Sequence, residues 1–102
     1  MNGSVQVITP EQWQDMSVDP NTVLIDLRSP EEYRQSHIDK AINIPYEQLR
    51  KITLYRRKKL ILYCEQGIRS TAAAMFLADH GYRVATLQGG IDAWNRYRKI
   101  SG

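Results

Sequence analysis

The chain has 102 residues, a net charge of +3, 42% hydrophobic residues and 25% charged residues, so we expect one ordinary globular domain over residues 1–102. No apolar stretch approaches the roughly 20 residues that cross a bilayer, and the segment 1–13 lacks the basic and long apolar regions of a signal peptide. The one cysteine, Cys64, cannot form an internal disulfide. We therefore expect a reducing, cytoplasmic location and no membrane partner.

The N-terminal half alternates short apolar stretches with helix-start signals. The stretches indicate strands at residues 5–8, 22–27 and 41–44. Between them, Thr9 and Ser29 each precede a proline. Gln12 and Glu32 follow three positions later, a spacing that predicts two helices opened by capping boxes.

The C-terminal half continues this alternation. The spacing of Tyr46, Leu49 and Ile52 indicates a short helix. Further strands are expected at residues 60–63 and 83–87, and further helices at residues 70–80 and 91–99. This order of elements predicts a three-layer α/β/α domain with a central, mostly parallel five-stranded sheet.

Cys64 stands at the end of a predicted strand, where sheets of this kind bind ligands. The loop that follows contains Glu65, Gln66, Gly67, Ile68 and Arg69. Gly67 helps such a loop to bend, and successive backbone N–H groups in the turn can form a nest for an anion. We expect Ser70 to cap the next helix through its hydroxyl.

This position makes Cys64 either a nucleophile or a buried filler residue, and the loop favours the nucleophile. The thiolate is the reactive form, and a helix N-terminus stabilises it by only ~0.3–1 kcal/mol, or ~2 kcal/mol in good geometry. Direct hydrogen bonds from N–H groups to the sulfur, or the positive charge of Arg69, must therefore supply further stabilisation of the thiolate. Glu65 would oppose a thiolate if it pointed inward, so we expect its side chain to point outward.

Three segments, in the same order, resemble the rhodanese family of sulfurtransferases. Residues 24–45, "LIDLRSPEEYRQSHIDKAINIP", are similar to the upstream signature of that family. "CEQGIRS" at residues 64–70 resembles its active-site loop, and "LQGGIDAW" at residues 87–94 resembles its C-terminal signature. Ser36 and Lys40 stand at positions where the family often has glycine. Because the family uses this segment as structure, the two differences concern the shape of its turns rather than the activity.

The resemblance implies a sulfurtransferase with a rhodanese-like fold and Cys64 as its catalytic nucleophile. Cys64 would take a sulfane sulfur from thiosulfate or from a persulfide, which a partner protein can carry, and pass it to a thiol or to cyanide. The substrate would be bound by the rest of the loop: Glu65, Gln66, Gly67, Ile68, Arg69 and Ser70. The resemblance implies no metal and no organic cofactor.

Two other functions stay open. The first is a non-catalytic or carrier module that takes sulfur from one protein and delivers it to another. The second is a phosphatase or arsenate reductase of the same fold, whose loop is Cys-x5-Arg. The spacing from Cys64 to Arg69 is Cys-x4-Arg, which suits one sulfur atom better than a tetrahedral oxyanion. Arg69 itself is either a contact for a donor anion or a surface arginine tied to a carboxylate.

The remaining polar residues favour structural roles. Asp26 and Arg28 lie near the predicted site and could tune it, but a structural ion pair that involves Glu31 or Glu32 is favoured. A turn role is expected for His37. A zinc site from Cys64, His37 and His80 has no recognisable ligand spacing. The basic run at residues 56–59 is expected to be a solvated loop, because no nucleic-acid motif accompanies it.

Overall fold

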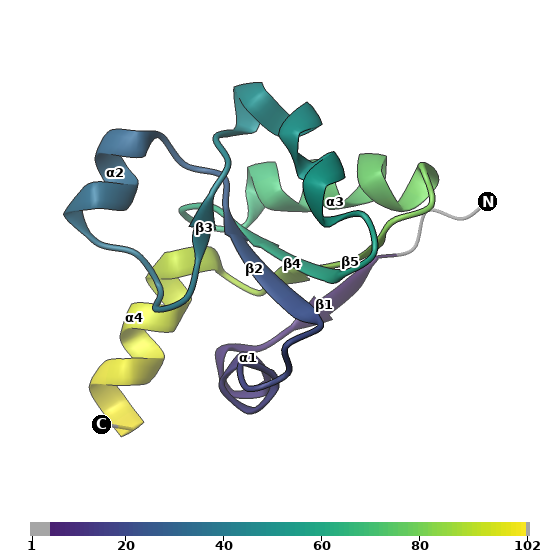
Figure 1. Ribbon diagram of the computed structural model, residues 1–102. Helices are drawn as coiled ribbons and strands as arrows, with labels where there is room; N and C mark the ends of the chain where they lie inside the picture. The colour runs from purple at the N-terminus through teal and green to yellow at the C-terminus, as the bar shows by residue number, and fades with distance from the viewer. Residues whose placement is uncertain (1–4, 102) are drawn as a thin grey trace.

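The computed structural model describes residues 5–101 (Figure 1). Residues 1–4, which belong to the segment considered for a signal peptide, lie outside the described residues. The strands are β1 (Gln6–Ile8), β2 (Thr22–Asp26), β3 (Ile42–Asn43), β4 (Lys59–Tyr63) and β5 (Arg83–Leu87). The helices are α1 (Pro10–Met16), α2 (Pro30–Gln35), the 3₁₀ helix η1 (Tyr46–Tyr55), α3 (Ile68–Asp79) and α4 (Gly90–Ser101). Across residues 5–101, no helix combines the length and the apolar character needed to span a bilayer.

The five strands form one sheet in the order β1-β5-β4-β2-β3, and every neighbouring pair is parallel. The predicted α/β class and the five-stranded sheet are therefore confirmed. β4 is the central strand: Leu60 lies beside Val23 of β2 and beside Val84 of β5. Because the strands are parallel, their carboxyl ends share one edge, and Cys64 follows β4 at that edge.

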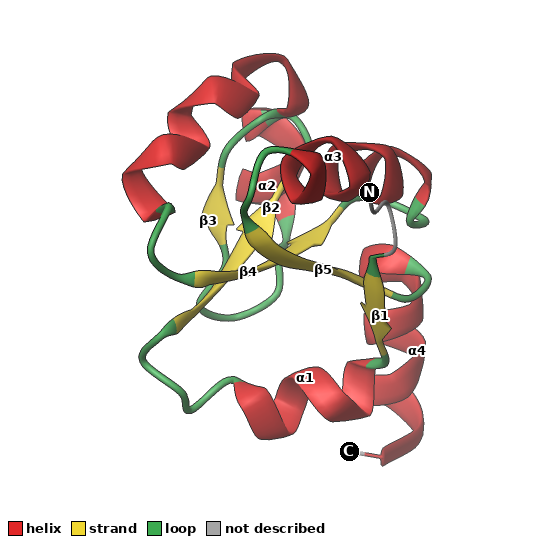
Figure 2. Ribbon diagram, turned by 90° about the vertical axis from the view of Figure 1, so that its right-hand side faces the viewer, coloured by secondary structure: helices red, strands yellow, loops and turns green. Residues whose placement is uncertain are grey.

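Helices cover both faces of the sheet, as Figure 2 shows for α3 on one side and α1 and α4 on the other. Side chains of β4 alternate between the two layers, as the pleat of a strand requires. Ile61 and Tyr63 join the core beneath α1 and α4, whereas Leu60 and Leu62 join the core beneath η1 and α3. Both cores are apolar, and each fully buried Leu or Ile contributes roughly 1.5–3 kcal/mol of burial free energy.

Both predicted capping boxes are present. The backbone N–H of Gln12 donates to the hydroxyl of Thr9 at 3.1 Å, and the Thr9 N–H donates to the Gln12 side chain at 2.8 Å. Ser29 and Glu32 make the same reciprocal pair at the start of α2. Each box satisfies two N–H groups that a helix start otherwise leaves without partners.

Several elements differ from the expectations in their boundaries or type. β1 begins at Gln6 rather than at Val5, and β3 is limited to Ile42–Asn43 because this edge strand pairs only with β2. The short helix after Pro45 is a 3₁₀ helix, with a break at Gln48 where φ is −113° and ψ is 28°. α3 begins at Ile68, two residues before the predicted start.

Candidate active site

Cys64 opens onto a cavity at the carboxyl edge of the sheet. Its side chain is 6% exposed, and the cavity has a volume of about 330 Å³. The walls come from the end of β2, from α2 and from the loop into α3: Leu27, Arg28, Glu32, Cys64, Glu65, Gln66, Ile68 and Arg69. The thiol is therefore sheltered, yet a small molecule can approach it.

Two backbone N–H groups point at the sulfur of Cys64. The N–H of Gly67 donates to Sγ at 3.3 Å, and the N–H of Ser70 donates to it at 3.4 Å. Gly67 is the N-cap of α3 and has a φ of 101°, a left-handed conformation that favours glycine. The loop therefore directs helix N-terminal donors at the thiol, and such donors stabilise negative charge on sulfur.

Ser70 does not cap α3, so that prediction was wrong. The cap is Gly67, which has no side chain to bond, and Ser70 lies inside the first turn. The Ser70 hydroxyl is buried, donates to the carbonyl of Gly67 at 3.3 Å and lies 2.8 Å from the hydroxyl of Thr86 on β5. This side chain therefore ties α3 to the sheet, while the backbone N–H of the same residue faces the sulfur.

The N-terminus of α4 holds the other side of the loop. The N–H of Ile91 donates to the carbonyl of Cys64 at 3.0 Å, and the N–H of Asp92 donates to the carbonyl of Glu65 at 3.2 Å. Each peptide group joins the C=O of one residue to the N–H of the next, and in a trans peptide these two groups point in opposite directions. Because the carbonyls of Cys64 and Glu65 face α4, the N–H groups of Glu65 and Gln66 point away from it. These two hydrogen bonds between α4 and the loop were not predicted from the sequence.

Close packing at this contact requires glycine at position 90. Gly90 has a φ of +61°, and a Cβ there would lie 2.6 Å from the carbonyl oxygen of Glu65. The same Cβ would also overlap the carbonyl oxygen of Cys64. The two adjacent glycines at the start of α4, Gly89 and Gly90, were the available signal, because glycine marks places where two backbones approach closely.

The charged side chains around the cavity are mixed in sign. Glu65 is exposed, and it lines the cavity together with Glu32. Hydrogen bonds from the backbone N–H and then the hydroxyl of Ser29 lower the pKa of Glu32, with smaller contributions from the positive charges of Arg28 and Arg69. The loop residues Gln66, Ile68 and Arg69 are also exposed.

Arg69 is not tied to a carboxylate. Among residues 5–101, the Asp26–Arg28 pair is the single salt bridge. The Arg69 guanidinium lies 5.8 Å from the ring centre of Tyr46, the first residue of η1. Of the two roles left open for Arg69, the surface ion pair is therefore absent in the described part of the chain.

A buried polar network supports the floor of the cavity. Arg28 pairs with Asp26 at 2.8 Å, and Tyr63 donates its hydroxyl to the same carboxylate at 2.6 Å. Arg28 also donates to the carbonyl of Ser36 at 2.6 Å, and the Ile38 N–H donates to the Tyr63 hydroxyl at 3.1 Å. A structural ion pair is present as expected, but it joins Asp26 to Arg28 rather than either of them to Glu31 or Glu32. The network connects β2 to the segment after α2.

This network raises the pKa values of both Tyr63 and Arg28. Burial, followed by the hydrogen bond to Asp26 and its charge, raises the pKa of Tyr63 well above its ordinary value. Burial alone lowers the pKa of Arg28, but the hydrogen bond to Asp26 and its charge outweigh that effect and leave the pKa raised. Tyr63 therefore stays neutral and Arg28 stays charged.

The two histidines do not approach Cys64. His37 bonds through Nδ1 to the carbonyl of Tyr33 at 2.7 Å and stacks on that ring, which fits the expected turn role. His80 bonds through Nδ1 to the carbonyl of Phe76 at the end of α3. Within residues 5–101, no three His, Cys, Asp or Glu side chains are grouped so that they could hold a metal ion.

Fold and loop together define a class of protein: a parallel α/β domain that presents one cysteine thiol to N–H groups at a helix start. The rhodanese-like domain model matches residues 9–97. A sulfurtransferase of Allochromatium vinosum is 35% identical over 80 residues, which cover 76% of this chain and 75% of that protein. The chain belongs to the rhodanese-like domain family.

Two further comparisons describe the range of relatives. The crystal structure of a rhodanese-related protein from Thermoplasma volcanium has a TM-score of 0.81 and 30% identity, and the match covers 90% of this chain and 92% of that one. The tRNA uridine(34) hydroxylase of Pectobacterium carotovorum (strain PC1) is 30% identical over 106 residues, which cover 95% of this chain. The chain spans only 30% of the length of that hydroxylase.

Proposed function

We propose that this protein is a sulfurtransferase that carries a sulfane sulfur on Cys64. The observation that carries the proposal is the pair of N–H groups, from Gly67 and Ser70, that point at Sγ of Cys64. A persulfide has a negative terminal sulfur, and donors of this kind stabilise it without a metal or an organic cofactor. The sulfurtransferase relative supports the same reaction class.

The transfer proceeds in two displacements. The thiolate of Cys64 attacks the outer sulfur of thiosulfate, the S–S bond of the donor breaks, and sulfite leaves with the bonding electron pair. Cyanide, or the thiolate of an acceptor, then attacks the terminal sulfur of the Cys64 persulfide. Thiocyanate or a new persulfide leaves, and the Cys64 thiolate is restored. The chain needs no external oxidant, because sulfur moves as a neutral atom from one nucleophile to the next.

The charged residues that line the cavity at Cys64 favour one class of sulfur donor over another. Glu32 and Glu65 line the cavity beside Arg69, and Arg28 is held by Asp26. We propose that Arg69 contacts the negative group of the donor and that the other loop residues hold its outer sulfur. One unpaired arginine against two carboxylates favours a donor with less charge than thiosulfate, such as a cysteine persulfide.

The loop length supports sulfur transfer over phosphate hydrolysis. Four residues separate Cys64 from Arg69, one fewer than in phosphatases of this fold. A smaller ring of N–H groups suits a single sulfur atom. Release of phosphate from an aryl phosphate, if it depended on Cys64, would favour the phosphatase.

The test uses the purified chain and a Cys64→Ser variant. Incubation with thiosulfate, or with glutathione persulfide, and cyanide should yield thiocyanate, and mass spectrometry should find one added sulfur atom on Cys64. The variant should yield neither. Turnover equal to that of the variant, together with no sulfur on Cys64 from either donor, would refute the proposal.

A second candidate is a sulfur-carrier module that serves partner proteins. It is favoured by the basic run at residues 56–59, whose positive charge attracts an acidic partner. Rapid persulfide exchange with a cysteine desulfurase, beside slow turnover of thiosulfate, would support it. Failure to take sulfur from a protein donor while thiosulfate turns over rapidly would exclude it.

A further inference from the structure

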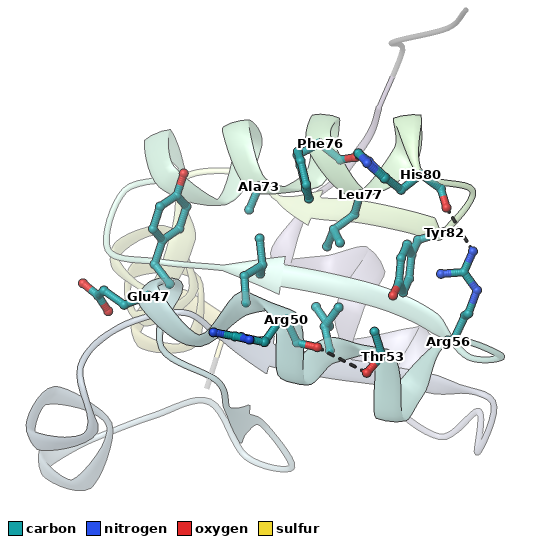
Figure 3. Close-up of a pocket in the computed structure, with 12 residues that line it drawn as sticks. Glu47, Arg50, Thr53, Arg56, Ala73, Phe76, Leu77, His80 and Tyr82 are labelled. Atoms are coloured by element: carbon teal, nitrogen blue, oxygen red, sulfur yellow. Dashed lines mark hydrogen bonds between the residues drawn. The ribbon is translucent and has the colours of Figure 1, made fainter.

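A second concave surface lies between η1 and α3 (Figure 3), and it shares no lining residue with the cavity at Cys64. We call it the η1–α3 groove. Its volume is about 600 Å³, compared with about 330 Å³ for the cavity at Cys64. A groove of this size accommodates one or two large side chains.

The floor of the η1–α3 groove is apolar. Leu77 of α3 and Ile52 of η1, both buried, line it, and the ring of Tyr82 lies at one end (Figure 3). The rim carries aromatic side chains that a core would ordinarily cover: Phe76 is 55% exposed and Tyr46 is 37% exposed. Apolar surface of this kind, bordered by polar residues, is typical of a protein interaction site.

The rim of the groove is predominantly basic. Arg50 and Arg56 of the lining have no carboxylate within salt-bridge distance, since the single salt bridge of residues 5–101 joins Asp26 and Arg28. Arg56 is held in place, because its guanidinium lies 4.6 Å from the ring centre of Tyr82 and donates to the carbonyl of His80 at 3.1 Å.

The charges of the lining are unequal in number. Glu47 is its one acidic residue, whereas Arg50 and Arg56 are both basic. A partner that brings carboxylates to this rim gains attraction at several points, whereas a basic partner is repelled.

We propose that the η1–α3 groove binds an acidic segment of a partner protein. A large apolar side chain of that segment enters the groove, and flanking carboxylates meet Arg50 and Arg56. The proposal does not depend on sulfur transfer by Cys64. It does bear on the site, because the groove begins at Tyr46, and Arg69 lies over that ring while also lining the cavity of Cys64.

The test measures binding of three synthetic peptides to the full chain by fluorescence anisotropy. The first peptide alternates Asp and Glu around one central Phe, the second has Ser in place of Phe, and the third has Lys in place of every acidic residue. The first peptide should bind with a Kd below about 1 mM, and binding should weaken as salt rises. The other two should bind about tenfold more weakly or not at all.

Matched variants locate the binding surface. The double variant Arg50→Glu, Arg56→Glu should bind the first peptide about tenfold more weakly. Arg34→Glu, Arg96→Glu makes the same change in net charge on α2 and α4, outside the groove lining, and should bind as the wild type does. Circular dichroism checks that each variant is folded.

A second matched pair tests the apolar contact. Phe76→Ser should weaken binding severalfold, whereas Met75→Ser should not. Met75 is its neighbour on α3, is 45% exposed and does not line the groove. Amide chemical shifts of the labelled protein should move along η1 and α3.

Several outcomes would overturn the proposal. One is equal binding of the first peptide to the Arg50→Glu, Arg56→Glu variant and to the wild type. Another is no binding of that peptide at about 1 mM. A third is light scattering that shows a dimer broken by Phe76→Ser, which would assign the groove to a second copy of the chain. Equal affinity for the Phe and Ser peptides would assign the interaction to charge alone and refute the groove as the binding site.

Discussion

Gly90 is the position at which one added methyl group should disable the loop around Cys64. The left-handed backbone there costs a non-glycine residue about 1–2 kcal/mol. A Cβ would also lie 2.6 Å from the carbonyl oxygen of Glu65, so α4 and the loop must separate. Loss of the two hydrogen bonds from Ile91 and Asp92 costs about 1 kcal/mol each. We therefore expect Gly90→Ala to lower the free energy of unfolding by about 3–4 kcal/mol.

Gly81→Ala is the matched control. Gly81 also has a positive φ, of +87°, but the nearest atom to an added Cβ is 3.7 Å away, at the end of the flexible Arg56 side chain. This variant should lose only the conformational cost of about 1–2 kcal/mol, and it should keep the reactivity of Cys64.

The assay has two parts. Urea denaturation, followed by tryptophan fluorescence, gives the free energy of unfolding of both variants. Reaction of the folded proteins with iodoacetamide, and transfer of sulfur from thiosulfate, report the state of Cys64. Sulfur transfer by Gly90→Ala should fall roughly 10- to 100-fold, because the N–H groups no longer face the sulfur. Equal losses of stability in the two variants, or wild-type sulfur transfer by a folded Gly90→Ala, would refute the argument that α4 holds the loop.

Two further predictions concern the buried network. Asp26→Asn leaves the charge of Arg28 buried without compensation, so it should lower the free energy of unfolding by about 3–5 kcal/mol, whereas the exposed control Asp39→Asn should change it by less than about 0.5 kcal/mol. Urea denaturation measures both, and a loss below about 1 kcal/mol for Asp26→Asn would contradict the role given to the ion pair. Tyr63→Phe should cost about 1–3 kcal/mol at neutral pH, because the N–H of Ile38 loses its partner. Because burial raises the pKa of Tyr63 above its ordinary value of 10.0, the unfolded chain releases this proton first as the pH rises. The wild type should therefore lose stability above about pH 10, and Tyr63→Phe should lose less over the same range; parallel pH profiles of the two proteins would count against this assignment.

The parts of the fold that depend on neighbouring residues could be predicted from the sequence. The capping boxes at Thr9 and Ser29 involve partners three residues away, so the pattern contains both members of each pair. The apolar strands were recognisable because both faces of the sheet are covered. Alternation of these strands with helices then fixed the class of the fold.

The parts of the fold and the site that depend on contacts between distant residues could not be predicted from the sequence. Ser70 has the residue type of an N-cap, but Thr86 of β5 and the carbonyl of Gly67 bind its hydroxyl instead. The hydrogen bonds of α4 with the loop join residues 27 positions apart, as the bond from Ile91 to Cys64 shows. The η1–α3 groove likewise forms only when two segments on either side of β4 pack together. The residue types around one position do not indicate which distant residues it will contact.

The central place of β4 has a consequence for how the protein fluctuates. An edge strand or a helix end opens locally, whereas amides of a strand paired on both sides exchange with solvent mainly through global unfolding. Leu60 and Ile61 are paired with β2 on one side and with β5 on the other. Cys64 is therefore attached to the segment with the slowest expected hydrogen exchange. Partial opening at β1, β3 or the end of α4 leaves the thiol in place, and its chemistry should persist until the whole sheet opens.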